Sequence, residues 1–83
     1  MSNSNNDRVR TYIEENFLFG AEGVTDETSL LDEGYIDSTS VLEIVGFLEE
    51  EFEISVLDEE LVPENFGSIG NLTAYLERKI SAA

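Results

Sequence analysis

The sequence contains no cysteine and no histidine. Without cysteine there are no disulfides and no thiolate nucleophiles, and without either residue most zinc sites are excluded. The commonest general base is missing too, so catalytic triads built on histidine are excluded. We therefore expect no catalytic residue and no metal-binding residue, and a protein that is not an enzyme.

Basic residues are also scarce: there are 4, against 19 acidic residues, and the net charge is −15. Arg8, Arg10, Arg78 and Lys79 lie near the two ends of the chain, and all but one of the acids lie between them. Such a field repels phosphate backbones and anionic lipids but attracts basic proteins. We expect protein partners and no nucleic-acid binding. Because like charges repel one another, divalent cations are expected to stabilise the fold.

Long apolar runs are absent as well. No segment approaches the roughly 20 residues of a membrane helix, and the N-terminus does not resemble a signal peptide. We expect no membrane insertion, a cytoplasmic location and a monomer. The chain has 83 residues, 41% of them apolar, which predicts a single domain with one modest core. Residues 1–6 are polar and are expected to be disordered.

Apolar residues recur at helical spacing near both ends of the chain. One such pattern predicts a first helix from Asp7 to about Leu18. Another predicts a last helix that Ser68 can cap. The apolar positions are Val9, Tyr12, Ile13 and Phe17 in the first helix, and Ile69, Leu72, Leu76 and Ile80 in the last.

A long loop is expected between residues 19 and 37. Gly20 and Gly23 break the helical period there, and threonine, serine and aspartate supply turn residues. The apolar side chains of the loop predict that it folds onto the core. They are Phe19, Val24, Leu30, Leu31 and Ile36.

A central helix is predicted from about Ser38 to Phe52. At about 100° per residue, its inward positions are Val41, Val45, Leu48 and Phe52, with Leu42 and Ile44 on the flanks. The opposite face carries Thr39, Glu43, Gly46, Phe47 and Glu50. Phe47 is therefore expected in solvent among acids.

The segment after the central helix is harder to assign. Ile54 to Leu57 is too short to distinguish strand from loop, and we interpret it as an apolar connection. A short helix is expected near Asp58 to Val62, and Pro63 is expected to end it. The resulting prediction is an all-α fold, a small four-helix bundle with a long first loop and a short third helix.

The stretch GYIDSTSVLEIV, residues 34–45, opens the central helix. Ser40 with Glu43 fits a capping box, and Asp37 or Ser38 could instead cap one turn earlier. Capping accounts for one of these residues. It does not account for an Asp-Ser pair directly before a helix whose exposed face is acidic.

Several segments together resemble the acyl carrier proteins, including the related peptidyl and aminoacyl carriers. They are Asp37-Ser38, VLEIVGFLEEEF (41–52), DEEL (58–61) and SIGNL (68–72). The resemblance implies that a phosphopantetheinyl transferase moves 4′-phosphopantetheine from coenzyme A onto Ser38. The thiol of that group would hold an acyl chain as a thioester. The lack of cysteine agrees, because a carrier without its own thiol needs an added one.

The resemblance also implies a docking surface for the transferase and for acyl-loading and acyl-transfer enzymes with basic surfaces. Asp37 would serve recognition by the transferase, and Glu43 and Glu50 would meet basic side chains. Contacts of this kind raise encounter rates more than affinity. The expected docking residues are Asp37, Thr39, Glu43, Phe47 and Glu50.

Three positions depart from the family pattern. Thr39 stands where leucine is common, Gly46 with Phe47 beside it stands where an apolar residue such as methionine is common, and Leu57 stands where proline is common. A glycine within a helix costs about 1 kcal/mol relative to alanine, so we expect the close approach of a partner or an acyl chain to offset Gly46. We predict a specialised carrier in which Phe47 replaces the usual apolar contact.

Two alternatives stay open at this point. The chain could be an acidic helical interaction module that is never modified, with Ser38 acting only as a cap. It could also be a stand-alone aminoacyl or peptidyl carrier. The resemblance implies a carrier of fatty-acid, lipid or secondary-metabolite synthesis.

Overall fold

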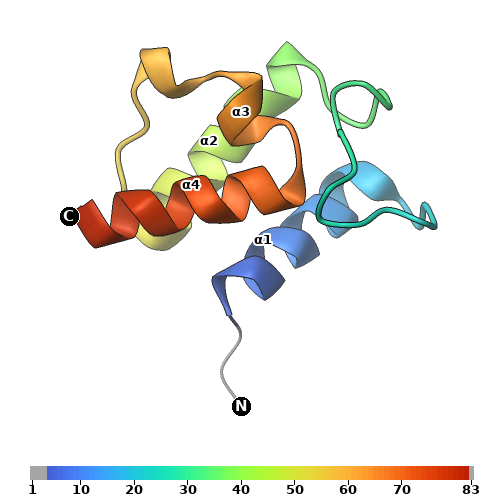
Figure 1. Cartoon of the computed structure of the whole chain (residues 1–83), viewed down its shortest axis with the longest axis horizontal. Helices are drawn as coiled ribbons and strands as arrows, with labels where there is room; N and C mark the ends of the chain where they lie inside the picture. The colour runs from blue at the N-terminus through green and yellow to red at the C-terminus, as the bar shows by residue number, and fades with distance from the viewer. Residues whose placement is uncertain (1–3, 83) are drawn as a thin grey trace.

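The computed structural model describes residues 4–82, and all regular structure within them is helical (Figure 1). The elements are α1 (Asn5–Ile13), its continuation as the π-helical turn η1 (Glu14–Leu18), α2 (Ser38–Phe52), the 3₁₀ turn η2 (Asp58–Glu60), α3 (Pro63–Phe66) and α4 (Ile69–Ala82). The predicted small four-helix fold is confirmed. No helix in the described part of the chain combines the length and apolar character needed to cross a bilayer.

The core is built around α4, which packs against both α1 and α3. Every helix and the long loop contribute side chains to it. Those that are 6% exposed or less are Val9, Ile13, Leu18, Leu30, Ile36, Ile44, Leu48, Phe66, Ile69, Leu72, Tyr75 and Leu76.

The first helix begins earlier than predicted. Ser4 caps it, because its Oγ accepts a hydrogen bond from the backbone N–H of Asp7 at 3.1 Å. Asn6 then lies within the helix, and its side chain is half-buried. The prediction that residues 1–6 are disordered is therefore wrong from Ser4 onward. Its remaining part, residues 1–3, lies outside the described residues.

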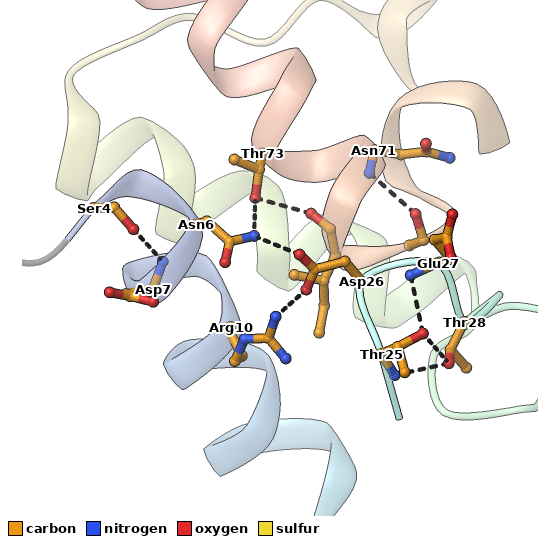
Figure 2. Close-up of polar contacts among 12 residues, drawn as sticks. Ser4, Asn6, Asp7, Arg10, Thr25, Asp26, Glu27, Thr28, Asn71 and Thr73 are labelled. Atoms are coloured by element: carbon orange, nitrogen blue, oxygen red, sulfur yellow. Dashed lines mark hydrogen bonds and ion pairs between the residues drawn. The ribbon is translucent and has the colours of Figure 1, made fainter. Parts of the chain in front are cut away.

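Asp26 ties the long loop to the first and last helices (Figure 2). Its carboxylate accepts a hydrogen bond from Asn6 Nδ2 at 3.1 Å and pairs with Arg10, and both partners lie on α1. Its backbone oxygen accepts from the N–H of Gly70 on α4 at 2.8 Å. Asn6 also donates to Thr73 Oγ1 on α4 at 3.3 Å. One acidic residue thus joins three parts of the chain.

The apolar side chains of the loop fold onto the core, as predicted, with one exception. Leu30 and Ile36 are buried, and Val24 and Leu31 pack against the core. Phe19 is 82% exposed, so the prediction for it is wrong. The chain leaves η1 through a left-handed conformation at Phe19, with φ 47°, and this turn leaves the ring in solvent.

The buried face of α2 is rotated relative to the prediction. Its most buried residues are Ile44 and Leu48, whereas Val41 and Val45 are half-buried and Leu42 is 62% exposed. At 100° per residue, the centre of the buried face lies roughly 50° toward Ile44 from the predicted centre. The helix bounds agree with the prediction, but the phase does not.

This rotation brings Phe47 against α1. Its ring stacks on Tyr12, with centroids 3.9 Å apart and an interplanar angle of 8°, and meets the edge of Phe52 at 5.9 Å. Phe47 is half-buried, so the prediction that it stands in solvent is wrong. Its partner Tyr12 lies on another helix, and the periodicity of α2 alone does not reveal it.

The third helix differs in position from the prediction. Only the turn Asp58–Glu60 is helical in the expected segment, and α3 begins at Pro63. The prediction that Pro63 ends a helix is wrong, because proline is well suited to the first helical position, where its missing N–H has no acceptor to lose. The residue before it, Val62, is extended, as proline requires.

The last helix begins as predicted. Ser68 Oγ accepts a hydrogen bond from the backbone N–H of Asn71 at 3.0 Å. Two side chains differ from the expected pattern: Ile80 is 40% exposed, and Tyr75 is buried at 2% exposure. Burial of the tyrosine is favourable because its hydroxyl group has a partner, Glu60.

Glu60 holds the connection between α2 and α3 against α4. Its Oε1 accepts hydrogen bonds from the backbone N–H of Leu57 at 3.0 Å, Tyr75 Oη at 2.8 Å and Lys79 Nζ at 3.0 Å. These bonds, chiefly that from the Leu57 N–H and then that from Lys79, lower the pKa of Glu60 to about 2. The carboxylate is thus stabilised in its charged form.

Candidate functional site at the start of α2

Asp37 is the residue that caps α2. Its backbone is extended, and its Oδ1 accepts hydrogen bonds from the N–H of Ser40 at 2.9 Å and from Ser40 Oγ at 3.1 Å. These bonds, first that from the Ser40 N–H, lower the pKa of Asp37 below its usual value. The alternative cap, Ser40 with Glu43, is not formed, because α2 begins at Ser38 and Ser40 already lies inside the helix.

Ser38 is the first residue of α2, and its side chain is exposed. Asp37 and Ser40 are hydrogen-bonded to each other, whereas the Ser38 hydroxyl has no hydrogen-bond partner within residues 4–82. The N–H groups of the first turn have no acceptor within the helix, and the helix dipole favours negative charge there. A phosphodiester on Ser38 would therefore fit this position, sterically and electrostatically.

An apolar hollow of about 470 Å³ lies beside Ser38, between α2 and the segment that leads into α3. It is lined by Leu31, Ser38, Val41, Leu42, Leu61, Val62, Pro63 and Phe66. The hollow explains why Leu42 and Val62 are exposed, since both border it. The sequence analysis missed Leu61 and Val62 as parts of the site. The signal was present: Leu61 and Val62 are two apolar residues directly before a proline.

The acids of α2 fall into two groups. Glu49 accepts a hydrogen bond from the N–H of Val56 at 2.9 Å, and Glu51 pairs with Arg8 at 2.8 Å. Glu43 and Glu50 are exposed and have no ion-pair partner among residues 4–82. The structure therefore leaves free the two glutamates that were predicted to dock partners.

Two other predicted docking residues, Thr39 and Phe47, differ in their exposure. Thr39 is exposed in the first turn of α2, close to Asp37 in the sequence and on the same side of the helix as Glu43 and Glu50. Phe47 is half-buried, with its ring stacked on Tyr12 of α1. Four of the five residues thus share the exposed side of α2 and its start.

All four basic residues of the chain are used in internal contacts. These contacts are Arg8 with Glu51, Arg10 with Asp26, Lys79 with Glu60, and Arg78 Nη2 with Asn65 Oδ1. Among residues 4–82, no basic side chain therefore pairs with Glu43 or Glu50 on the exposed side of α2. Its charge is available to a partner.

The sequence of this chain matches a known protein family. The family model described as a phosphopantetheine attachment site matches residues 7–76. The acyl carrier protein of Thermotoga maritima is 30% identical over 73 residues, covering 88% of each chain. That of Exiguobacterium sp. is 37% identical over 57 residues, covering 69% of this chain and 70% of the relative.

Two further similarities extend the comparison. The probable acyl carrier protein PigG of Serratia sp. is 29% identical over 72 residues, covering 86% of this chain and 83% of the relative. A chain in a crystal structure of an FAD-dependent dehydrogenase has a TM-score of 0.73 and 25% identity to this protein. That match covers 82% of this chain and 97% of the solved one.

The fold and the family model together define the class of protein, a helical domain with a phosphopantetheine attachment site. The chain belongs to the acyl carrier protein family. Its cofactor is covalently attached 4′-phosphopantetheine, and it is a carrier, not an enzyme. Membership also implies interaction with a phosphopantetheinyl transferase and with synthesis enzymes. The expected family, cofactor and non-enzymatic role are confirmed.

Proposed function

We propose that Ser38 carries the 4′-phosphopantetheine and that the whole chain acts as one carrier domain for acyl intermediates. The observation that supports this most is the free hydroxyl of Ser38 at the tip of a capped helix. Ser40 offers the same functional group, but its hydroxyl is bonded to Asp37. Thr39 is exposed but carries a more crowded secondary alcohol.

The chain contributes position and electrostatics to this role. Asp37 fixes the first turn of α2, and the free N–H groups there favour the negative charge of a phosphodiester on Ser38. The bound group supplies a thiol, which the chain itself lacks, and that thiol holds the acyl chain as a thioester. The apolar hollow beside Ser38 gives an apolar cargo a surface to contact.

The exposed side of α2 is the docking surface in this proposal. Asp37 and Thr39 lie beside the attachment residue, and Glu43 and Glu50 extend the surface along the helix. Basic partner enzymes would be steered toward this uncompensated charge, which raises association rates while allowing quick release. A carrier that visits several enzymes needs both properties.

We further propose a specialised pathway in place of housekeeping fatty-acid synthesis. Thr39, Gly46 and Leu57 depart from the family pattern, and one relative is the probable carrier PigG. The cargo, acyl or aminoacyl, would be identified by trapping and weighing the thioester formed in the native cell. The expected cytoplasmic location and monomeric state stay predictions.

A second, narrower proposal concerns one partner. The similar chain from the structure of an FAD-dependent dehydrogenase is nearly fully covered by the match, so it has the size of a carrier domain. This supports an FAD-dependent dehydrogenase as an enzyme that oxidises the carried acyl group, with reduction of its FAD. Anaerobic mixing of the loaded carrier with such a dehydrogenase should bleach the oxidised flavin. When free cargo replaces the loaded carrier, the flavin should stay oxidised. Bleaching by free cargo alone would contradict the proposal.

Intact-mass measurement tests the attachment. Incubation with coenzyme A, Mg²⁺ and a broad-specificity phosphopantetheinyl transferase should add about 340 Da. Ser38→Ala should abolish the gain, and the matched variant Ser40→Ala should retain it. A wild-type chain that gains no mass would favour the rival interpretation, an acidic interaction module that is never modified.

A further inference from the structure

Gly46 has no structural explanation within the chain. It lies in the middle of α2, where glycine disfavours a helix relative to alanine. Its side of the helix is exposed, and a methyl group built on its α carbon would meet nothing within 4 Å beyond its chain neighbours and the backbone of its own helix. Packing among the described residues therefore does not require glycine, in contrast to Gly67, where a methyl group would lie 2.5 Å from the backbone oxygen of Pro63.

An open hollow of about 470 Å³ lies over Gly46, on the surface where α2 meets α1. Its lining residues are Tyr12, Glu43, Gly46, Phe47, Glu50 and Glu51. The stacked rings of Tyr12 and Phe47 supply flat apolar surface, and the glutamates supply carboxylates around it. The hollow is thus aromatic in part and acidic in part, and it is separate from the apolar hollow beside Ser38.

The same chemistry already binds an arginine elsewhere on this face. Arg8 places its guanidinium carbon 4.3 Å from the centroid of the Phe52 ring and pairs with Glu51 at 2.8 Å. Phe52 in turn contacts Phe47 edge-on. The hollow over Gly46 offers the same combination, an aromatic pair with carboxylates, but residues 4–82 provide no cation for Glu43 or Glu50.

We propose that the hollow over Gly46 receives an arginine side chain of a partner enzyme. The guanidinium would lie against the Tyr12 and Phe47 pair and donate to Glu43 or Glu50. A planar guanidinium can stack on a ring and donate two parallel hydrogen bonds, whereas an ammonium is compact and strongly hydrated. The inference rests on the proposed carrier function, and it adds α1 to the docking surface through Tyr12.

The binding test uses the full chain and two small probes of equal charge, N-acetyl-arginine amide and N-acetyl-lysine amide. Amide resonances of Gly46 and Phe47 should shift saturably with millimolar arginine amide at low salt, and those shifts should be smaller with lysine amide. Gly46→Leu places a bulky side chain in the hollow and should weaken arginine binding about tenfold. Equal shifts at all acidic residues, or unchanged binding by Gly46→Leu, would overturn the proposal.

A second variant covers the case in which Gly46→Leu does not fold. Gly46→Ala should raise Tm by about 4 °C, because the added methyl group meets no neighbour and alanine favours the helix. A lower Tm would mean that the fold itself needs the glycine, which would overturn the proposal. Phosphopantetheine addition to the wild-type chain is measured separately. If the wild-type chain is modified but does not bind arginine amide better than lysine amide, the arginine site is overturned and the carrier function is not.

Discussion

Charge is used differently on two sides of this molecule. Where the loops meet α1 and α4, acids are paired with the few cations of the chain, as in Arg10 with Asp26 and Lys79 with Glu60. On the exposed side of α2, Glu43 and Glu50 have no such partner among residues 4–82. We expect the internal pairs to act on stability, and in the proposed function the unpaired acids act on encounter with other proteins.

The comparison teaches how a strongly acidic chain stays folded and still presents charge. With only 4 basic residues, each cation is placed where it joins separate segments. Most of the acids have no cationic partner among residues 4–82, and Glu43 and Glu50 are two of these, on the exposed side of α2, where a basic partner can relieve their repulsion. Variants that remove one side or the other should therefore affect different measurements.

Breaking the paired side should have the largest effect on folding. Asp26→Ala removes the carboxylate that holds Asn6 and Arg10, and the free energy of unfolding should fall by about 1.5 kcal/mol. For a chain of this size, Tm should fall by roughly 6–12 °C in a calorimetric melt. Its neighbour Glu27 is exposed and serves as the control: Glu27→Ala should change Tm little. Equal melts for the two variants would contradict the role of Asp26.

Removing the unpaired charges on α2 should not lower Tm, and it should slow association with partners. With Glu43→Gln and Glu50→Gln combined, kcat/KM of the transferase should fall about fivefold at low salt, because steering is weakened. The difference should shrink as ionic strength rises.

The control for this experiment removes the same charge elsewhere. Glu27→Gln and Glu33→Gln combined change two exposed loop acids. This pair should have a much smaller effect on kcat/KM. Equal losses for the two double variants would mean that net charge, and not the exposed side of α2, governs encounter.

The sequence was sufficient to predict features that depend on neighbouring residues. The bounds of the helix from Ser38 to Phe52 and the cap at Ser68 follow from local spacing and capping chemistry, and the structure agrees. The family followed from the Asp37-Ser38 pair and its surrounding segments, and the comparisons confirm it.

Features that depend on distant contacts could not be predicted. The phase of α2 is set by packing against other helices, so the stacking of Phe47 on Tyr12 was missed. Asn6 is ordered by contacts to Asp26 in the loop and Thr73 on α4.

The position of α3 was missed for a local reason, because a proline such as Pro63 can either end a helix or begin one. Proline permits both.

Acid should lower the stability of the fold by protonating Glu60, which is paired with Lys79. Its pKa is about 2 in the folded protein, below the ordinary value of 4.5, so the unfolded chain binds this proton more readily. The stabilising contribution is complete above about pH 4.5 and is lost as the pH falls toward 2. Denaturant unfolding from pH 6 downward should show the wild type losing its advantage over Glu60→Gln in this range. Parallel stability curves would contradict this account.

Divalent cations should produce the smallest effect. No group of three or more histidine, cysteine, aspartate or glutamate side chains within residues 4–82 is arranged to hold a metal ion. Mg²⁺ should therefore associate diffusely with the acids, without a fixed site, and raise Tm by a few degrees at matched ionic strength, with Ca²⁺ acting similarly. Melts that show no rise with either ion would count against self-repulsion as a strain on the fold.

The most direct test of the central claim locates the cofactor among three adjacent hydroxyl groups. Cleavage of the modified protein after Glu33 and Glu43 releases the peptide 34–43, which contains Ser38, Thr39 and Ser40. Fragmentation of this peptide should assign the added mass of about 340 Da to Ser38 alone. Assignment of that mass to Thr39 or Ser40, or to any other peptide, would contradict the account.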